Sequence, residues 1–93
     1  MTYSLTTSYY VAPEPVMEKI LEFAKTIPEA SMPICKGNGT IEFEVKFEKG
    51  FTEELFHARV LERLRDWLQS SEILTTVSLY KDAGYILSYR KRK

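Results

Sequence analysis

The stretch TIEFEVKFE, residues 40–48, decides the fold because apolar and charged side chains alternate along it after the first threonine. Successive side chains of a β-strand point to opposite faces of a sheet, so a period of two predicts a half-buried strand. One face turns toward a core and the other toward water. The inward residues are Ile41, Phe43, Val45 and Phe47, and the outward residues are Glu42, Glu44, Lys46 and Glu48.

Two stretches before this strand predict a first strand and a first helix. Residues 3–11 (YSLTTSYYV) also alternate, in β-branched and aromatic residues, which predicts a strand. Apolar residues from Val16 to Ile27 recur at three- and four-residue spacing, which predicts an amphipathic helix that Pro28 ends. Residues 32–36 (MPICK) predict a short strand joined to residues 40–48 through a GNG turn. Pro33 lacks an N–H group, so this strand belongs at an edge.

A second helix and a hairpin follow. Residues 50–71 begin with Thr52 as N-cap and two glutamates that suit the helix dipole, while Phe51 and Phe56 occupy the positions of a hydrophobic staple. Residues 73–80 and 85–91 predict two strands joined by the turn KDAG, in which Asp82 and Gly84 are suitable turn residues.

This order of elements predicts an α+β two-layer sandwich. Its first six elements fit a ferredoxin-like β-α-β-β-α-β unit, and the last strand extends the sheet as an extra C-terminal antiparallel strand. Right-handed crossovers place both helices on one face, which leaves the other face open to water or to a partner. We expect one domain over residues 1–93, with a short basic end at residues 90–93.

Composition favours a globular cytoplasmic protein. The chain is 44% hydrophobic and 28% charged, which is ordinary for a folded domain. Its single cysteine, Cys35, cannot form an internal disulfide, which fits a reducing compartment. The first residues lack a basic region and an apolar run, and no stretch approaches the ~20 apolar residues of a membrane span. We therefore expect no signal peptide and no membrane segment.

Charge is spread unevenly along the chain. The last four residues carry four of the 13 cations, so the other 89 residues hold 9 cations against 13 acids, a net charge of −4. Three interpretations of this basic end stay open. It protects the terminal edge strand from indiscriminate pairing, binds an acidic protein surface, or binds nucleic acid weakly together with Tyr85 and Tyr89.

The open face is expected to be rich in hydroxyl groups, with glutamates along a central strand. Those carboxylates repel a phosphate backbone, which disfavours RNA recognition on this face. A protein partner is favoured instead, either by face-to-face packing of two sheets or by pairing of the terminal strand with its copy. The candidate interaction residues are Tyr10, Glu42, Glu44, Tyr80, Tyr85, Tyr89, Arg90, Lys91, Arg92 and Lys93.

No catalytic motif stands out. His57 could serve as a general base oriented by Glu53 or Glu54, but no nucleophile is placed beside it, so a helix residue near water is the simpler interpretation. Cys35 is interpreted as a small apolar residue of an edge strand. One Cys and one His do not make a zinc site, which needs four ligands. We expect no enzyme, no metal and no cofactor.

The sequence therefore predicts a small non-enzymatic protein-interaction or regulatory domain, acting as a homodimer through its open sheet face or terminal edge strand. The first alternative is a weak nucleic-acid-binding protein that uses the basic C-terminal strand. A further alternative is a small-ligand binder or enzyme with its site between helices and sheet.

Overall fold

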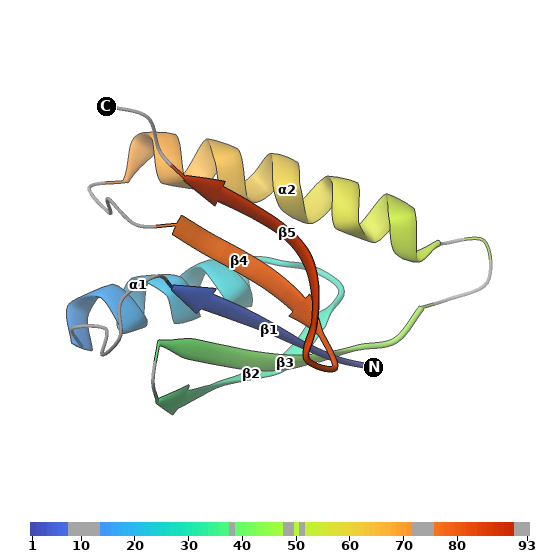
Figure 1. Cartoon of the computed structure of the whole chain (residues 1–93), viewed down its shortest axis with the longest axis horizontal. Coiled ribbons are helices and arrows are strands. Elements are labelled where there is room, and N and C mark those ends of the chain that lie inside the picture. Colours follow the sequence, from blue (N-terminus) through green and yellow to red (C-terminus); the bar gives the residue numbers. More distant parts are fainter. Residues whose placement is uncertain (8–13, 38, 48–49, 51, 72–75, 91–93) are drawn as a thin grey trace.

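The computed structural model describes residues 1–7, 14–37, 39–47, 50, 52–71 and 76–90. It shows an α+β fold with a five-stranded antiparallel sheet and two helices, which confirms the predicted class (Figure 1). The elements are β1 (Thr2–Thr7), α1 (Glu14–Lys25), β2 (Ala30–Gly37), β3 (Thr40–Val45), α2 (Glu53–Ser70), β4 (Thr76–Lys81) and β5 (Gly84–Arg90).

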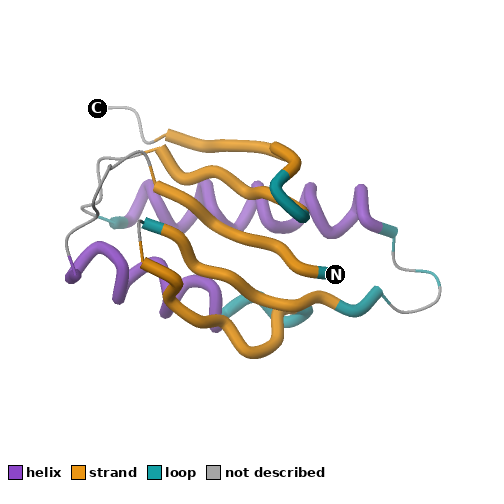
Figure 2. Tube along the Cα trace, turned by 60° about the horizontal axis from the view of Figure 1, so that its bottom comes forward, coloured by secondary structure: helices purple, strands orange, loops and turns teal. Residues whose placement is uncertain are grey.

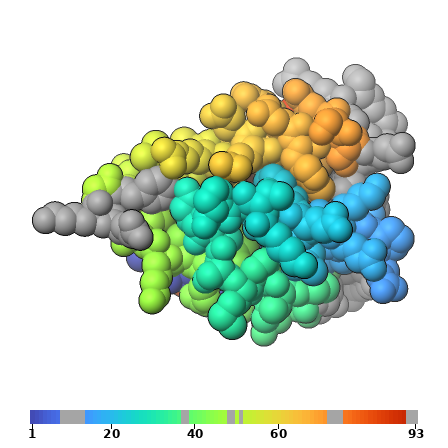
Figure 3. Space-filling view, turned by 180° about the vertical axis from the view of Figure 1, so that it is seen from behind, coloured from blue at the N-terminus to red at the C-terminus, as the bar shows by residue number. Residues whose placement is uncertain are grey.

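The strands lie in the order β2-β3-β1-β4-β5, and every neighbouring pair is antiparallel. Both helices lie behind the sheet in Figure 2. Seen from that side in Figure 3, α2 (yellow to orange), α1 (blue) and the residues after α1 (cyan) cover the sheet. Within the part of the chain that the structure describes, no helix or loop crosses the front of the sheet. The two faces therefore have different surroundings.

The core forms between the helices and the alternate residues of the strands. Ile41, Phe43 and Val45 are buried, as their spacing predicts, and they pack in one cluster with buried residues of both helices. The helix residues in this cluster are Met17, Ile20, Phe23 and Ala24 of α1 and Phe56, Val60, Leu64 and Leu68 of α2. Burial of these side chains, at ~25 cal/mol per Å² of apolar surface, is the main source of stability.

The strand expected over residues 40–48 is shorter than its pattern. Strand β3 ends at Val45, and the next two residues have no strand structure. Its neighbours explain this end, because both reach β3 last at Val45: Ala30 of β2 pairs with Val45 on one side, and Met1, just before β1, hydrogen-bonds to its N–H and C=O on the other. Phe47 still packs against the core, with its ring 5.6 Å from that of Phe56. Apolar alternation thus continues beyond the last residue that has a strand to pair with.

Other boundaries lie within a few residues of those expected where they are described. Helix α1 ends at Lys25, before the expected end at Pro28, and β2 is longer than the expected residues 32–36. Strand β1 covers Thr2–Thr7, and the remainder of the expected first strand, residues 8–11, lies outside the described residues. Phe51 of the expected hydrophobic staple lies outside them too. Helix α2 begins as predicted, since the Thr52 hydroxyl accepts a hydrogen bond of 3.2 Å from the Leu55 N–H.

Strand β2 takes the edge position that Pro33 predicts, and it is irregular. Its pairing with β3 shifts between Ser31 and Ile34 and again between Cys35 and Gly37. Met32 has a φ of 52°, a left-handed conformation that costs a residue with a side chain about 1 kcal/mol or more. The shift around Met32 and Pro33 lets the proline sit where no ladder hydrogen bond is needed.

The β4-β5 hairpin closes on a two-residue loop. Lys81 pairs with Gly84, and the loop residues Asp82 and Ala83 have φ values of 49° and 75°. Positive φ at both loop residues gives the twist that two-residue hairpins prefer. Asp82 is a turn residue as expected, whereas Gly84 begins β5 and Ala83 takes the second loop position.

Candidate interaction surface

One row of side chains crosses all five strands on the helix-free face. Each residue of the row lies directly opposite the next in the strand pairing, so all five point to the same side of the sheet. From edge to edge this central row consists of Ile34, Glu42, Ser4, Tyr80 and Tyr85. Its end residues are exposed large side chains, Ile34 at 47% and Tyr85 at 60%. The row thus has bulky groups at both edges of the sheet and polar groups between them.

A second row on the same face contains only small hydroxyl side chains. Thr6 lies opposite Thr40 on one side and opposite Ser78 on the other, and Ser78 lies opposite Ser88. We call Thr40, Thr6, Ser78 and Ser88 the hydroxyl row. Because these side chains are short, the face beside the central row is low and polar.

The two tyrosines of the central row support each other. Their rings meet edge to face, with centroids 5.8 Å apart and planes at 76°, an arrangement that aromatic rings favour. The Tyr85 hydroxyl also lies 2.9 Å from the Ser88 Oγ. Both contacts hold an exposed ring in one orientation on the helix-free face.

A β-bulge decides which tyrosines of β5 share this face. Leu79 pairs with Leu87 but Tyr80 pairs with Tyr85, so β5 contains one extra residue between these pairs. As a result Tyr89, opposite the buried Val77, points to the helix side. Its hydroxyl accepts a hydrogen bond of 3.3 Å from the amide Nε2 of Gln69 in α2. Tyr85 and Tyr89 therefore lie on opposite faces and cannot stack bases on one surface.

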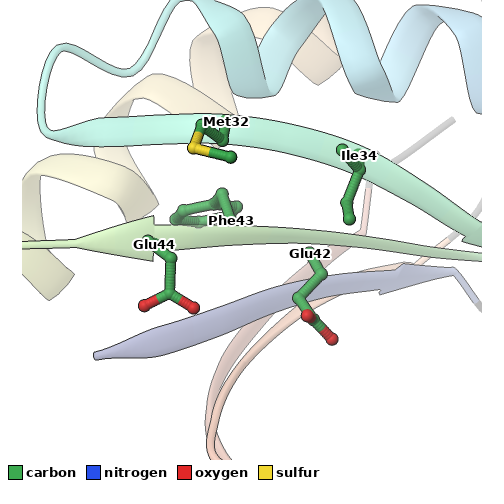
Figure 4. Close-up of a pocket in the computed structure, with 5 residues that line it drawn as sticks. All are labelled: Met32, Ile34, Glu42, Phe43 and Glu44. Atoms are coloured by element: carbon green, nitrogen blue, oxygen red, sulfur yellow. The ribbon is translucent and has the colours of Figure 1, made fainter.

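A hollow of about 170 Å³ lies at the other end of the central row. It is lined by Met32 and Ile34 of β2 and by Glu42, Phe43 and Glu44 of β3. Figure 4 shows Ile34 reaching from β2 toward β3, and both glutamates pointing from β3 toward β1, with Glu42 passing over it. Met32 is 79% exposed. At ~30 Å³ for each water the hollow would hold roughly six waters, which is room for one side chain and not for an extended ligand.

Glu42 and Glu44, both on the helix-free face, have different partners. The Thr2 hydroxyl donates a hydrogen bond of 2.6 Å to Glu44 Oε1, and this bond holds the pKa of the Glu44 carboxyl below its usual value. The amino group of Met1 lies 3.5 Å from the other Glu44 oxygen. Glu42 has a looser contact, with the Lys36 Nζ 4.0 Å away at the surface. Glu42 therefore has the weaker contacts of the two carboxylates, although its side chain is 38% exposed and that of Glu44 is 52% exposed.

On the helix side, His57 contacts a buried tyrosine. The Tyr3 hydroxyl lies 2.9 Å from His57 Nε2. Burial raises the pKa of Tyr3 to about 12, so at neutral pH the hydroxyl keeps its proton and we assign it as the donor. Burial lowers the pKa of His57, which favours the neutral ring that accepts this bond. The pair joins β1 to the first turns of α2.

Glu53, one of the two expected partners of His57, binds a different residue. Both carboxylate oxygens of Glu53 lie 2.8 Å from the Lys81 Nζ, which links α2 to β4. The Tyr3–His57 and Glu53–Lys81 pairs therefore hold the start of α2 on the sheet. Sequence patterns did not reveal either pair, because both depend on which strands lie under the helix.

The other candidate residues lie as follows. Arg90 is exposed at the end of β5 and pairs in register with Thr76. Cys35 is exposed on β2. Tyr10, Lys91, Arg92 and Lys93 lie outside the described residues. The structure thus brings Glu42, Tyr80 and Tyr85 into one row, with Glu44 beside it.

Sequence reasoning missed Met32 and Ile34 as surface residues. The signal was present but weak, since a proline between two apolar residues in an edge strand favours a bulge. A bulge changes which side each residue faces, so alternation alone could not place them.

Among the described side chains, no group of three or more His, Cys, Asp or Glu could hold a metal ion. Neither described helix is long and apolar enough to cross a membrane. Comparison of the chain with protein-family models, curated proteins and solved structures gave no match.

Proposed function

We propose that this chain is a small non-enzymatic interaction or regulatory protein that acts as a homodimer through the helix-free face of its sheet or through its terminal strand. The carrying observation is the central row, which has exposed bulky groups, Ile34 and Tyr85, at its two ends. Isolated exposed apolar residues are ordinary on a protein surface. Two of them at opposite ends of one uncovered row favour a flat partner that spans the sheet.

The edges of the sheet support a role for β5 as well. Strand β2 has two register shifts and a proline, which are features that discourage pairing with another chain. Strand β5 has a single bulge near its start and regular pairing from Leu87 to Arg90. An added strand would find a more regular ladder at β5 than at β2.

The proposal includes two finer statements. The strand order supports classing the first six elements as ferredoxin-like with β5 appended. The single cysteine, exposed on β2, supports a reducing, cytoplasmic setting.

Sedimentation equilibrium over a concentration series tests the dimer. We expect the apparent mass to rise from that of one 10.8 kDa chain toward twice that value as the concentration enters the micromolar range. A compact monomer at high micromolar concentration would remove the homodimer from the proposal. Adding salt at a fixed concentration would then show whether charge contributes to the association.

A further inference from the structure

The two ends of the central row differ in shape. At the β2 end, Met32 and Ile34 border the hollow of about 170 Å³. At the β5 end, Tyr85 presents an aromatic ring that its contacts with Tyr80 and Ser88 hold in place. A ring fixed before binding loses little conformational entropy when it enters a hollow. One end of the row is therefore a receptor for a side chain of the kind found at the other end.

The inner residues of the row match in the same way. Glu42 lies next to the β2 end and Tyr80 next to the β5 end, with Ser4 in the middle. A phenol hydroxyl donates a strong hydrogen bond to a carboxylate. When two copies face each other with their central rows running in opposite directions, Tyr80 of one copy lies over Glu42 of the other. Ser4 of one copy then lies over Ser4 of the other.

A two-fold axis parallel to β1 produces this reversal. Rotation by 180° about such an axis places the β5 end of one sheet over the β2 end of the other and leaves β1 over β1. The hydroxyl row then meets its own copy, with Thr6 over Thr6 and Thr40 over Ser78. These side chains are all short, so they do not prevent close packing of the two faces.

On these grounds, and resting on the homodimer proposed above, we propose that two copies pack with their helix-free faces together about a two-fold axis parallel to β1. Tyr85 of each copy enters the hollow between Met32 and Ile34 of the other. Such a contact is isologous and closed, since each copy supplies one ring and one hollow.

The size of the face sets the expected strength. Five strands at ~4.8 Å and six residues at ~3.4 Å give a face of roughly 500 Å² per copy, or about 1,000 Å² in a dimer. This is close to the lower limit for a specific interface. The dimer should therefore dissociate at accessible concentrations, which makes variants easy to compare.

Subunit mixing tests the arrangement. Ile34→Lys and Tyr85→Asp each place a charge in both contacts of the dimer, so each alone should weaken association on the order of tenfold to a hundredfold. In an equal mixture, the heterodimer keeps one unaltered contact and pairs the new ammonium with the new carboxylate in the other. The mixture should recover most of the wild-type association in sedimentation equilibrium.

A matched control comes from the helix layer. Leu61 of α2 is also exposed, at 38%, but lies on the other side of the molecule, so Leu61→Lys should leave the dimer unchanged. Circular dichroism and a urea midpoint establish that each variant is folded.

The outcomes separate this inference from the proposed function. A wild-type monomer removes both. A wild-type dimer that Tyr85→Asp dissociates and Ile34→Lys does not would place the interface at β5, which overturns the face-to-face arrangement and leaves the homodimer standing. If Ile34→Lys and Tyr85→Asp are each monomeric and their mixture is monomeric too, the two central rows do not run in opposite directions, and the proposed arrangement is wrong.

Discussion

The two faces of the sheet are built by the same strands but have opposite chemistry. In β3, Phe43 is 1% exposed beneath the helices, while the adjacent Glu42 and Glu44 lie on the helix-free side. In β1, Tyr3 and Leu5 are buried and Ser4 belongs to the central row. Alternation therefore separates the residues that determine stability from those open to a partner. A substitution should change one property and leave the other nearly unchanged.

Polar side chains on the two faces of the sheet differ in their hydrogen-bond partners. On the helix side the Tyr3 hydroxyl and the Tyr89 hydroxyl both have partners in α2, His57 and Gln69. On the helix-free side, within the described part of the chain, the contact of Glu42 is the 4.0 Å ion pair with Lys36. The Tyr3–His57 pair follows the rule that buried polar groups need partners, because water cannot easily replace them. The buried Thr7 hydroxyl, also on the helix side, has no hydrogen-bond partner among the described residues.

The largest expected effect comes from Phe43→Ala. Removing a fully buried ring loses its transfer free energy and leaves a cavity, so the free energy of unfolding should fall by about 3–5 kcal/mol. The neighbouring Glu42→Ala should change it by less than about 0.5 kcal/mol, since it lies at the surface. Urea denaturation of both variants measures this contrast. Equal losses would mean that the two faces do not differ as described.

A smaller effect is expected from Tyr3→Phe. The ring and its packing against Phe43 and Phe56 remain, but the hydrogen bond to His57 is lost. Since His57 is only half-buried, water can reach its ring, and the loss should be about 1 kcal/mol. The Tyr85→Phe variant is a matched control on the helix-free face, where the free energy of unfolding of the monomer should hardly change. If Tyr85→Phe lowered the free energy of unfolding as much as Tyr3→Phe does, the two faces of the sheet would not differ in this way.

Acid should weaken the helix side through the same pair. Burial lowers the pKa of His57 below its ordinary value of 6.5, while Glu53 and Glu54 on α2 oppose this shift and Lys81 on β4 adds to it. The unfolded chain then binds the proton more readily, so the free energy of unfolding is at its full value above pH 6.5 and decreases as the pH falls through the folded pKa. Urea midpoints at pH 7.5, 6.5 and 5.5 should decline more for wild type than for His57→Gln. Parallel declines would show that His57 does not titrate differently on folding.

Much of the helix side could be predicted from the sequence. Alternation in residues 40–48 placed Ile41, Phe43 and Val45 in the core, and Thr52 marked the start of α2. These signals are local, because a strand's period and a helix cap depend on neighbouring residues alone. The end of β3 was not predictable, since it depends on how far β1 and β2 run beside it.

The helix-free side was only partly predictable. Glu42 and Tyr80 follow from alternation, but Ile34 and Tyr85 depend on irregular pairing in β2 and β5. One extra residue in a strand reverses every later side chain, and whether it occurs depends on the partner strand. The composition of the central row therefore became clear only when the registers of all five strands were known.

The smallest expected effect concerns the hairpin that sets the register of β5. Ala83 has a φ of 75°, a conformation that costs a residue with a Cβ about 1–2 kcal/mol, although a glycine also loses more entropy on folding. Ala83→Gly should therefore raise the free energy of unfolding by about 0.5–1 kcal/mol in urea denaturation. Because the loop lies outside both rows, the dimer dissociation constant should stay the same. Gly84→Ala is the informative counterpart, since its Cβ would lie 3.2 Å from the Lys81 carbonyl oxygen and should not stabilise. If Ala83→Gly lowered stability or changed association, the turn would have to contribute side-chain contacts to one of the faces.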